Sequence, residues 1–305
     1  MQAKKNLLIS VVGPTAVGKT KFAIELARAY NAEIVSADSR QFYKELEIGT
    51  AKPDADELAA AKHHFINSHS INDYYNVGQF EADVLVLLEE LFQKNSIVIM
   101  VGGSGLFFKA VWEGFDEMPE VDLSLRKQLN NEFEQNGLEP LLQELNETDP
   151  KYYEQVDRQN HQRVIRALEV IRTTSKPFSE FRKGHQAKER LFTNVKIGLE
   201  MEREVLFDRI NRRMDLMIEQ GLFEEAERLM EYKDHNALQT VGYSEIFGYL
   251  DGEYDREEAV RLLKRNSRRY AKRQMTWFKR DEEIIWMQPN DLDQAIRLIN
   301  KSLNA

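Results

Sequence analysis

The sequence predicts an α/β fold in which a parallel sheet carries helices on both faces, with an all-helical insertion added to it. Three observations lead to this prediction. Short β-branched apolar runs alternate with amphipathic helical segments over the first hundred residues, only helical patterns occur from about residue 121 to residue 190, and strand-like runs return afterwards. We therefore expect a core of residues 1–120 and 191–305 and a helical insertion over residues 121–190.

The first three strands are predicted from buried apolar runs that end in turn residues: "LLISVVG" from Leu7, "AEIVSAD" from Ala32 and "SIVIMVGG" from Ser96. Between the first two lies "KTKFAIELARAY", where large apolar residues recur every four positions from Phe22 and predict a helix. "HHFINS" is read as a further short strand and "VGQFEADVLVLLEELFQKN" as a helix. Alternation of this kind is typical of parallel sheets.

The insertion is predicted from four helical segments, namely "LRKQLNNEFEQNG", "LEPLLQELN", "DPKYYEQV" and "NHQRVIRALEVIRTT". In the third, Asp149 is the expected N-cap and Pro150 the first helical residue. In the fourth, Val164, Leu168 and Ile171 lie on one face. "NVKIGLEM" and "EEIIWM" then predict a return to the sheet.

Composition sets limits on location and partners. The absence of cysteine excludes disulfides, cysteine nucleophiles and Cys-based zinc fingers. No apolar stretch approaches the roughly 20 residues of a membrane span, and "MQAKKNLLIS" offers no A-x-A-like cleavage site, so a cytoplasmic protein is expected. The net charge of -9 disfavours nucleic-acid binding by the whole surface, so any such partner requires a local basic face.

A phosphate-binding loop is predicted at "GPTAVGKT", where Gly13, Gly18, Lys19 and Thr20 match G-x-x-x-x-G-K-[ST] between a strand and a helix. Glycines let backbone N–H groups surround phosphate oxygens, and the helix N-terminus adds its dipole. Lysine neutralises phosphate charge, and the Thr20 hydroxyl can ligate Mg²⁺. The core is thus expected to resemble that of P-loop-containing nucleoside triphosphate hydrolases.

Nucleotide hydrolysis also requires an acidic residue at the end of a second strand, to hold the metal. The candidate strand "IVIMV" ends instead in "GGSG", which weakens the assignment as an ATPase. A glycine-rich turn at the carboxyl edge of a parallel sheet lines the ligand crevice. Ser104 in this turn is therefore either a substrate contact or simply part of a tight turn.

Asp38 follows the second strand in "SADSRQFY" and is expected at the same carboxyl edge. Two interpretations remain open. In the first, Asp38 has a structural role, either as a helix cap or as a hydrogen-bond partner of the ligands of a metal. In the second, it acts as a general base that takes a proton from an incoming nucleophile.

A basic segment extends from Lys264 to Arg280, "KRNSRRYAKRQMTWFKR", with eight Lys or Arg and no carboxylate. On a helix, Arg265, Arg269 and Arg273 stack at four-residue intervals with aromatic residues between them. In an acidic protein this run favours phosphate contact over a merely solvated face. "QRVIR" in the insertion forms a smaller basic edge.

Together these blocks resemble the tRNA dimethylallyltransferase (tRNA isopentenyltransferase) family of the bacterial type. The blocks that carry the resemblance occur in the order of that family: "GPTAVGKT", "SADSRQFY", "IGTAKP", "HHFIN", "VGGSGLFFKAVWEGF", "NHQRVIRALEVIR", "RINRRMDLMIEQGL", "VGYSEIFGYLDG" and "AKRQMTWFKR". The resemblance implies a prenyltransferase in which the loop holds the diphosphate of dimethylallyl diphosphate. The group would be transferred to N6 of adenosine 37 of tRNA, while the insertion clamps the anticodon stem-loop.

The resemblance also implies roles for individual residues. Asp38 would be the general base, Lys19 and Thr20 would also be catalytic, and Thr20 would bind Mg²⁺. Diphosphate and substrate binding would fall to Gly13, Pro14, Thr15, Ala16, Val17, Gly18, Lys19, Thr20 and Ser104. Contact with tRNA would fall to Asp38, Ser39, Arg40, Gln41, Ser104, Arg126, Gln162, Arg163, Val164, Ile165, Arg166, Lys272, Arg273, Gln274, Trp277 and Lys279. A monomer is expected, and Ser104 and Phe107 depart from the threonine and tyrosine usual in the family.

Two other functions fit parts of the sequence. An ATP-dependent small-molecule kinase shares the loop and sheet but leaves the basic helix unexplained. A non-catalytic RNA-binding module leaves the placement of Asp38 without purpose. His63 and His64 are adjacent, so on a strand they point to opposite faces, and we interpret them as structural. Trp112, Trp277 and Trp286 are expected in the core.

Overall fold

The computed structural model describes residues 5–182 and 187–304, which form two compact units. Of the described residues, one unit comprises 5–112 and 190–304, and the other comprises 113–182 and 187–189. The first unit contains six strands in a single sheet of order β3-β2-β4-β1-β5-β6, in which every neighbouring pair is parallel. The strands are β1 (Leu7–Val12), β2 (Ile34–Ser36), β3 (His63–His64), β4 (Ile97–Val101), β5 (Thr193–Leu199) and β6 (Ile285–Met287). The predicted parallel α/β sheet is therefore confirmed.

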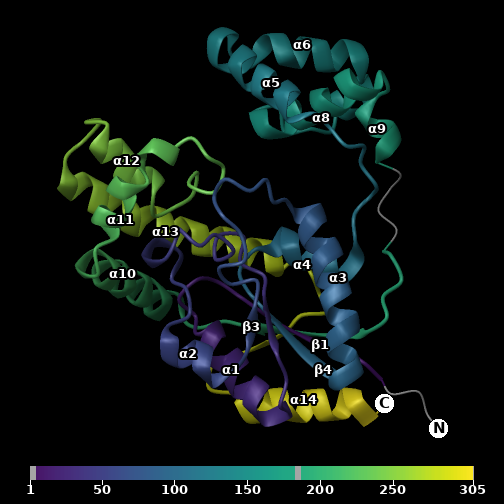
Figure 1. Ribbon diagram of the computed structural model, residues 1–305, viewed down its shortest axis with the longest axis vertical. Helices are drawn as coiled ribbons and strands as arrows, with labels where there is room; N and C mark the ends of the chain where they lie inside the picture. The colour runs from purple at the N-terminus through teal and green to yellow at the C-terminus, as the bar shows by residue number, and fades with distance from the viewer. Residues whose placement is uncertain (1–4, 183–186, 305) are drawn as a thin grey trace. The chain divides into compact units, whose positions relative to one another are not determined.

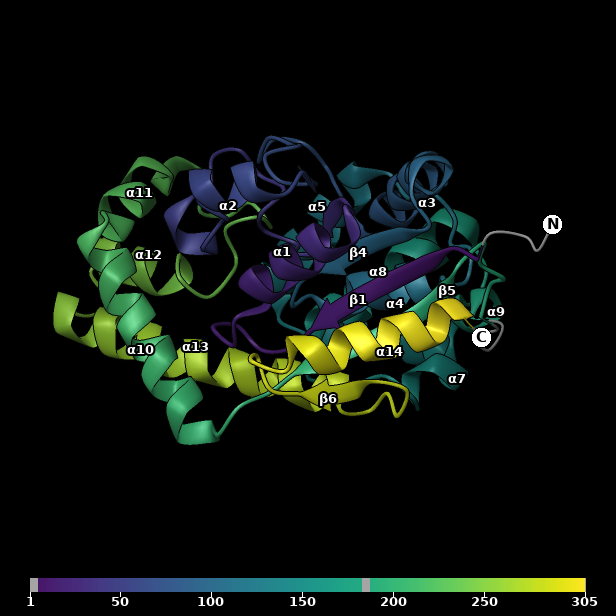
Figure 2. The same ribbon diagram turned by 90° about the horizontal axis from the view of Figure 1, so that it is seen from below.

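Helices cover both faces of this sheet, as Figures 1 and 2 show. Alternate residues of β1 face opposite sides, so that Leu7, Ile9 and Val11 join one core cluster while Leu8 and Val12 join another. The first cluster includes α1 (Lys19–Tyr30) and α14 (Leu292–Asn304), and the second includes α3 (Val77–Lys94) and α4 (Gly105–Glu113). The sheet is thus buried on both sides, which explains its continuous apolar runs.

A third cluster of the first unit lies among its helices rather than against the sheet. Its helices are α10 (Arg203–Glu219), α11 (Leu222–Arg228), α12 (Ser244–Leu250) and α13 (Arg256–Phe278), with short 3₁₀ turns at η1 (Ile48–Thr50) and η2 (Met230–Tyr232). A small helix, α2 (Ala55–Ala60), begins at the capping box of Asp54 and Glu57. Within this cluster, α10 packs against α13.

In its described residues the second unit contains helices and loops but no strand, and it has its own apolar core. It contains α5 (Leu123–Asn136), α6 (Glu139–Thr148), α7 (Pro150–Tyr153), α8 (His161–Thr174) and α9 (Phe178–Phe181). Asp149 caps α7 by accepting a hydrogen bond from the Tyr152 N–H at 3.0 Å, as predicted. The helix is shorter than predicted because the Tyr152 carbonyl accepts bonds from both Gln155 and Val156, which closes it in a turn.

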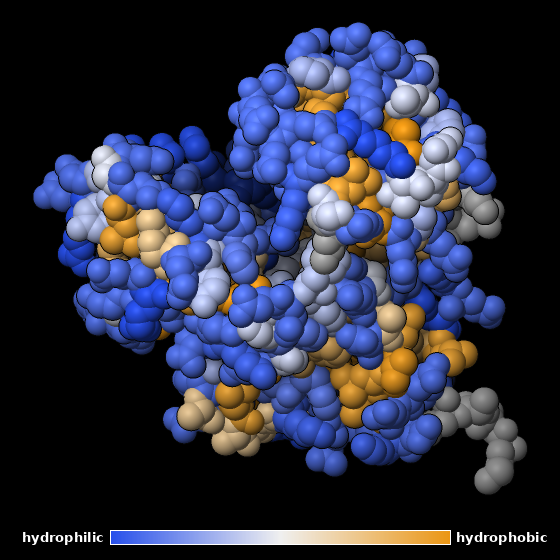
Figure 3. Space-filling view, turned by 45° about the horizontal axis from the view of Figure 1, so that its top comes forward, coloured by the Kyte–Doolittle hydropathy of each residue, from blue (hydrophilic) through white to orange (hydrophobic). Residues whose placement is uncertain are grey.

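The surface is largely hydrophilic on the face seen in Figure 3, with separate hydrophobic patches. Within the described part of the chain, no helix combines the length and apolar character needed to cross a membrane.

Candidate active site

The loop between β1 and α1 adopts a backbone conformation that suits the predicted phosphate-binding loop. Three of its residues have positive φ, at 145° for Gly13, 65° for Ala16 and 110° for Gly18. A Cβ on Gly13 would lie 2.6 Å from the Leu199 carbonyl oxygen of β5, so only glycine fits there. Gly18 immediately precedes α1, which therefore begins at Lys19 with its N-terminus at the loop.

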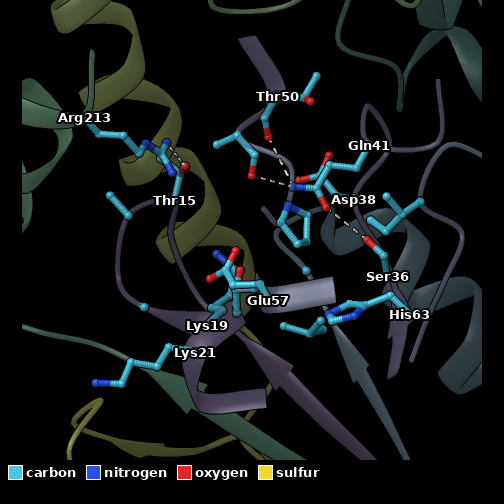
Figure 4. A pocket seen from close by; sticks show the side chains of 18 of the residues that line it. Thr15, Lys19, Lys21, Ser36, Asp38, Gln41, Thr50, Glu57, His63 and Arg213 are labelled. Carbon is cyan, nitrogen blue, oxygen red and sulfur yellow. Dashed lines mark hydrogen bonds between the residues drawn. The ribbon is translucent and has the colours of Figure 1, made fainter. Parts of the chain in front are cut away.

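This loop forms one wall of a cavity of about 310 Å³ at the carboxyl ends of the strands, shown in Figure 4. The cavity is lined by residues of the loop, of the strand ends and the segments after them, and of α1, α2 and α10: Thr15, Ala16, Gly18, Lys19, Thr20, Lys21, Ser36, Asp38, Gln41, Thr50, Ala51, Pro53, Glu57, His63, Ile66, Val101, Gly102, Arg209 and Arg213. Val17 instead packs its side chain into the core and contributes only its backbone to the loop.

Lys19 is held inside the loop, where its Nζ donates to the Pro14 carbonyl at 2.7 Å. Burial lowers the pKa of Lys19 from 10.5 to about 7, because loss of water disfavours the charged form. Asp38 opposes this effect and Arg213 adds to it. A bound anion would restore the charge, since an opposite charge nearby favours the ammonium form.

Two arginines of α10 reach the loop, and neither was predicted from the sequence. Arg209 donates from Nε to the Ala16 carbonyl at 3.0 Å, and Arg213 donates from Nη2 to the Thr15 hydroxyl (Figure 4). The Nε of Arg213 is buried and has no hydrogen-bond partner among the described residues. Their spacing of four residues in "RINRR" placed them on one helix face and was the available signal. Both arginines belong to the first unit.

The segment after β2 carries Asp38 to the cavity. Asp38 accepts a hydrogen bond at Oδ1 from the Arg40 N–H at 3.0 Å, which fixes the direction of its carboxylate. The Ser104 hydroxyl accepts from the Ser39 N–H at 3.0 Å and lies 3.3 Å from the Ser39 hydroxyl. Ser104 therefore ties the turn after β4 to the segment that bears Asp38, and a contact between Ser104 and substrate stays a prediction.

Gln41 supports the opposite wall of the cavity. Its Nε2 donates to the Thr50 and Ala51 carbonyls at 3.2 and 3.1 Å, and its Oε1 accepts from the Ser36 hydroxyl at 3.3 Å (Figure 4). These bonds fix the wall formed by Thr50 and Ala51.

Three of the residues expected to contact tRNA have buried side chains in this structure. Val164 and Ile165 are completely buried in the core of the second unit, because they lie on the apolar face of α8. Gln274 of α13 is buried and accepts a hydrogen bond from the Thr15 N–H at 2.8 Å while it donates to the Gly103 carbonyl at 3.0 Å. Gln274 thus connects the phosphate-binding loop to the turn after β4.

The outer face of α13 remains basic in the structure. Arg269, Lys272, Arg273, Thr276, Trp277 and Arg280 line a shallow hollow of about 450 Å³. Lys279 pairs with Glu200 at 3.0 Å and lies over the Trp286 ring. Trp277 and Trp286 are only partly buried, in contrast to Trp112.

In the second unit, Arg126 donates from Nη2 to the Gln162 Oε1 at 3.1 Å, so α5 and α8 share a polar edge. Gln162 and Arg163 are exposed at the start of α8, and Arg166 is partly exposed one turn later. His63 and His64 lie on opposite faces of β3, where His64 contacts Glu33 at 2.6 Å and His63 contacts the Ala61 carbonyl at 2.8 Å. The His64 contact agrees with a structural interpretation, whereas His63 also lines the cavity, so its structural interpretation stays a prediction.

Comparison with known proteins assigns the chain to a family. Residues 41–281 match the model of the IPP transferase family. The chain is 52% identical to a tRNA dimethylallyltransferase of Cytophaga hutchinsonii, over 97% of each chain, and 52% identical to one of Christiangramia forsetii, over 93% of each.

Solved structures agree with this assignment. A tRNA isopentenylpyrophosphate transferase from Bacillus halodurans superimposes with a TM-score of 0.72 at 37% identity, covering 99% of this chain and 97% of its own. A eukaryotic dimethylallyltransferase, described as acting on tRNA, gives a TM-score of 0.77 at 26% identity over 95% of this chain and 75% of its own. The chain belongs to the tRNA dimethylallyltransferase family, also called the IPP transferase family.

Proposed function

We propose that this chain transfers a dimethylallyl group from dimethylallyl diphosphate to N6 of adenosine 37 in the anticodon loop of tRNA and releases diphosphate. Membership of the family makes it a prenyltransferase that acts on tRNA. The observation that carries the finer proposal is the cavity itself, in which a phosphate-binding loop and Asp38 line the same space. This alkyl transfer requires a site that holds the departing diphosphate and a base that removes the proton of the amine.

The loop, Lys19 and the α10 arginines would hold the diphosphate. Backbone N–H groups at the start of α1 bind phosphate oxygens, and Arg209 and Arg213 direct guanidinium groups to the same loop. These groups stabilise the negative charge that grows on diphosphate as it leaves, so they act more strongly in the transition state than in the ground state.

Mg²⁺ is the metal that we expect with the diphosphate. Among the residues that the structure describes, no group of three or more His, Cys, Asp or Glu could hold a metal ion. Mg²⁺ does not need such a group, because it commonly binds through phosphate oxygens of the substrate, water molecules and only one or two side chains. Thr20, which lines the cavity, would contribute its hydroxyl. When bound, the ion would neutralise charge on the diphosphate.

Asp38 would act as the general base at the adenine. The exocyclic amine is a weak nucleophile because its lone pair is delocalised into the ring, so removal of its proton must accompany attack. In the proposed step the nitrogen forms a bond to the allylic carbon, the carbon–oxygen bond to diphosphate breaks with its electron pair, and the amine proton passes to the Asp38 carboxylate. Ser39 and Arg40 follow Asp38 directly and would contact the adenine.

RNA would bind to the basic faces of both units. The exposed cations of α13 and the polar edge of Arg126, Gln162, Arg163 and Arg166 would contact the phosphates of the anticodon stem-loop. The target base must leave its stack, which costs least in an unpaired loop. We propose that the chain works as a cytoplasmic monomer.

The proposal is tested by incubating the protein with dimethylallyl diphosphate, Mg²⁺ and an unmodified anticodon stem-loop, followed by mass spectrometry of the RNA and assay of released diphosphate. One dimethylallyl group should appear per RNA, located at adenosine 37, with an equal amount of diphosphate. A stem-loop with guanosine at position 37 serves as the control. Diphosphate release without RNA modification, or phosphorylation of a metabolite from ATP, would contradict the proposal.

A further inference from the structure

The second unit contains a buried carboxylate that joins the two arginines expected to bind RNA. Glu169 lies on the inner side of α8 and its side chain is only 1% exposed. Its Oε1 lies 3.3 Å from the Arg126 Nη1 of α5, and its Oε2 lies 3.1 Å from the Arg166 Nη1, one turn earlier on α8. One carboxylate therefore contacts guanidinium groups from two helices.

Both arginines also reach the surface. The Arg126 side chain is 30% exposed and that of Arg166 is 36% exposed, although the carboxylate between them is buried. Through Nη2, Arg126 also donates to Gln162, so that Glu169 fixes the neighbouring amide indirectly. A guanidinium carries five N–H donors, and the contacts described use two nitrogens of Arg126 and one of Arg166. Donors thus remain for phosphate oxygens.

A carboxylate is an unexpected group beneath an RNA-binding surface. Coulomb's law alone makes it unfavourable for RNA binding, because it adds a negative charge near the phosphates. Burial of a carboxylate is also costly unless cations compensate it. Long, flexible arginine side chains, however, lose rotamer entropy when they bind, and this loss is smaller if they are already held in place.

We propose that Glu169 is a positioning residue for RNA recognition, which holds Arg126 and Arg166, and through Arg126 also Gln162, in the arrangement that contacts the RNA backbone. This inference rests on the proposed function, because it requires the second unit to bind RNA. It differs from a purely structural role, in which the ion pairs would only fasten α5 to α8. The inference also predicts weaker RNA binding when the charge of Glu169 is removed, whereas simple electrostatics predicts tighter binding, so the two can be told apart by experiment.

Two substitutions separate charge from position. Glu169→Gln removes the negative charge and keeps the shape, while Glu169→Asp keeps the charge but is too short to reach both arginines. Simple electrostatics predicts tighter RNA binding for the first and no change for the second. If Glu169 positions the arginines, both variants should raise the KM for tRNA about tenfold, the effect of losing one charge-assisted hydrogen bond, while kcat at saturating tRNA stays unchanged.

Glu144→Gln is the matched control. Glu144 is a carboxylate of the same unit that pairs with Arg172 at 2.6 Å, and Arg172 keeps a second partner in Glu132 at 2.8 Å. This variant removes one negative charge and leaves the Glu169 contacts in place. Its KM for tRNA should equal that of the wild type or fall slightly.

The measurements are steady-state kinetics with tRNA and binding of the anticodon stem-loop over a series of salt concentrations, together with thermal unfolding. A lower melting temperature with an unchanged KM for both Glu169 variants would overturn the inference, as would tighter RNA binding by Glu169→Gln. If these variants fail to fold, Arg126→Lys decides the question, because it keeps the charge and loses the fork that reaches both Glu169 and Gln162. An unchanged KM in that variant would overturn the inference and an increased KM would support it. Absence of prenyl transfer by the wild type would instead refute the proposed function.

Discussion

The low pKa of Lys19 predicts that diphosphate binding takes up a proton. Burial sets this pKa at about 7 in the free protein, whereas the bound diphosphate should raise it toward its ordinary value of 10.5. Above pH 7 the free lysine is mostly neutral and must gain a proton on binding. Below pH 7 it already carries its charge, so binding takes up little.

The magnitude follows from the fraction protonated. With a pKa of about 7, roughly nine-tenths of Lys19 is charged at pH 6 and roughly one-tenth at pH 8. The affinity for pyrophosphate should therefore fall by about tenfold over this interval because of Lys19, and binding at pH 8 should take up about 0.9 proton. Isothermal titration calorimetry of pyrophosphate with Mg²⁺, in buffers of different ionisation enthalpy, measures both quantities.

Lys19→Arg is the control for this experiment. A guanidinium remains charged throughout the range, so the variant reports only the ionisation of the ligand and of other groups. The difference between wild type and variant belongs to Lys19. If the wild type and Lys19→Arg take up the same number of protons at pH 8, then Lys19 is charged in the free protein and the reasoning from burial is wrong.

Three further predictions concern the site and the RNA face. Asp38→Asn should lower kcat by about 10²–10⁴-fold with unchanged tRNA affinity, as expected for loss of a general base, and near-normal turnover would remove Asp38 from that role. Gln274→Ala should destabilise the protein in thermal unfolding by about 1–3 kcal/mol for each buried hydrogen-bonding group left without a partner, and an unchanged melting temperature would contradict the bridge between loop and turn. Replacement of Arg269 and Arg273 together by alanine should weaken RNA binding and lower the slope of log K against log salt by about one to two, whereas an unchanged slope would place the RNA elsewhere.

The fold could be predicted from the sequence because its signals are local. The alternation of apolar runs and helical repeats defines strands and helices within ten to twenty residues, and a glycine-rich loop after the first strand predicts where the sheet would bind a phosphate. Asp149 illustrates this, since Asp-Pro at the start of a helix identifies a cap without further information.

The site could be predicted only where its residues belong to such local motifs. Arg209 and Arg213 lie nearly two hundred residues after the loop that they contact, and their four-residue spacing is also that of any solvated helix face. Gln274 was assigned to RNA from the family resemblance of the segment around it, although the helix turns its side chain inward toward Thr15. Glu169 gave no signal, because one acidic residue in an amphipathic helix is ordinary in sequence and its burial depends on the packing of α5 against α8.

The central place of β1 has a consequence for how the protein fails. All six of its residues are buried, and the strand is bonded to β4 on one side and β5 on the other. The predicted phosphate-binding loop therefore follows a strand that is completely buried, where we expect amide hydrogens to exchange with solvent only when the whole unit opens. Heat or denaturant should accordingly abolish pyrophosphate binding and melt the sheet in a single transition, so that loss of ligand binding serves as a direct gauge of global unfolding in this unit.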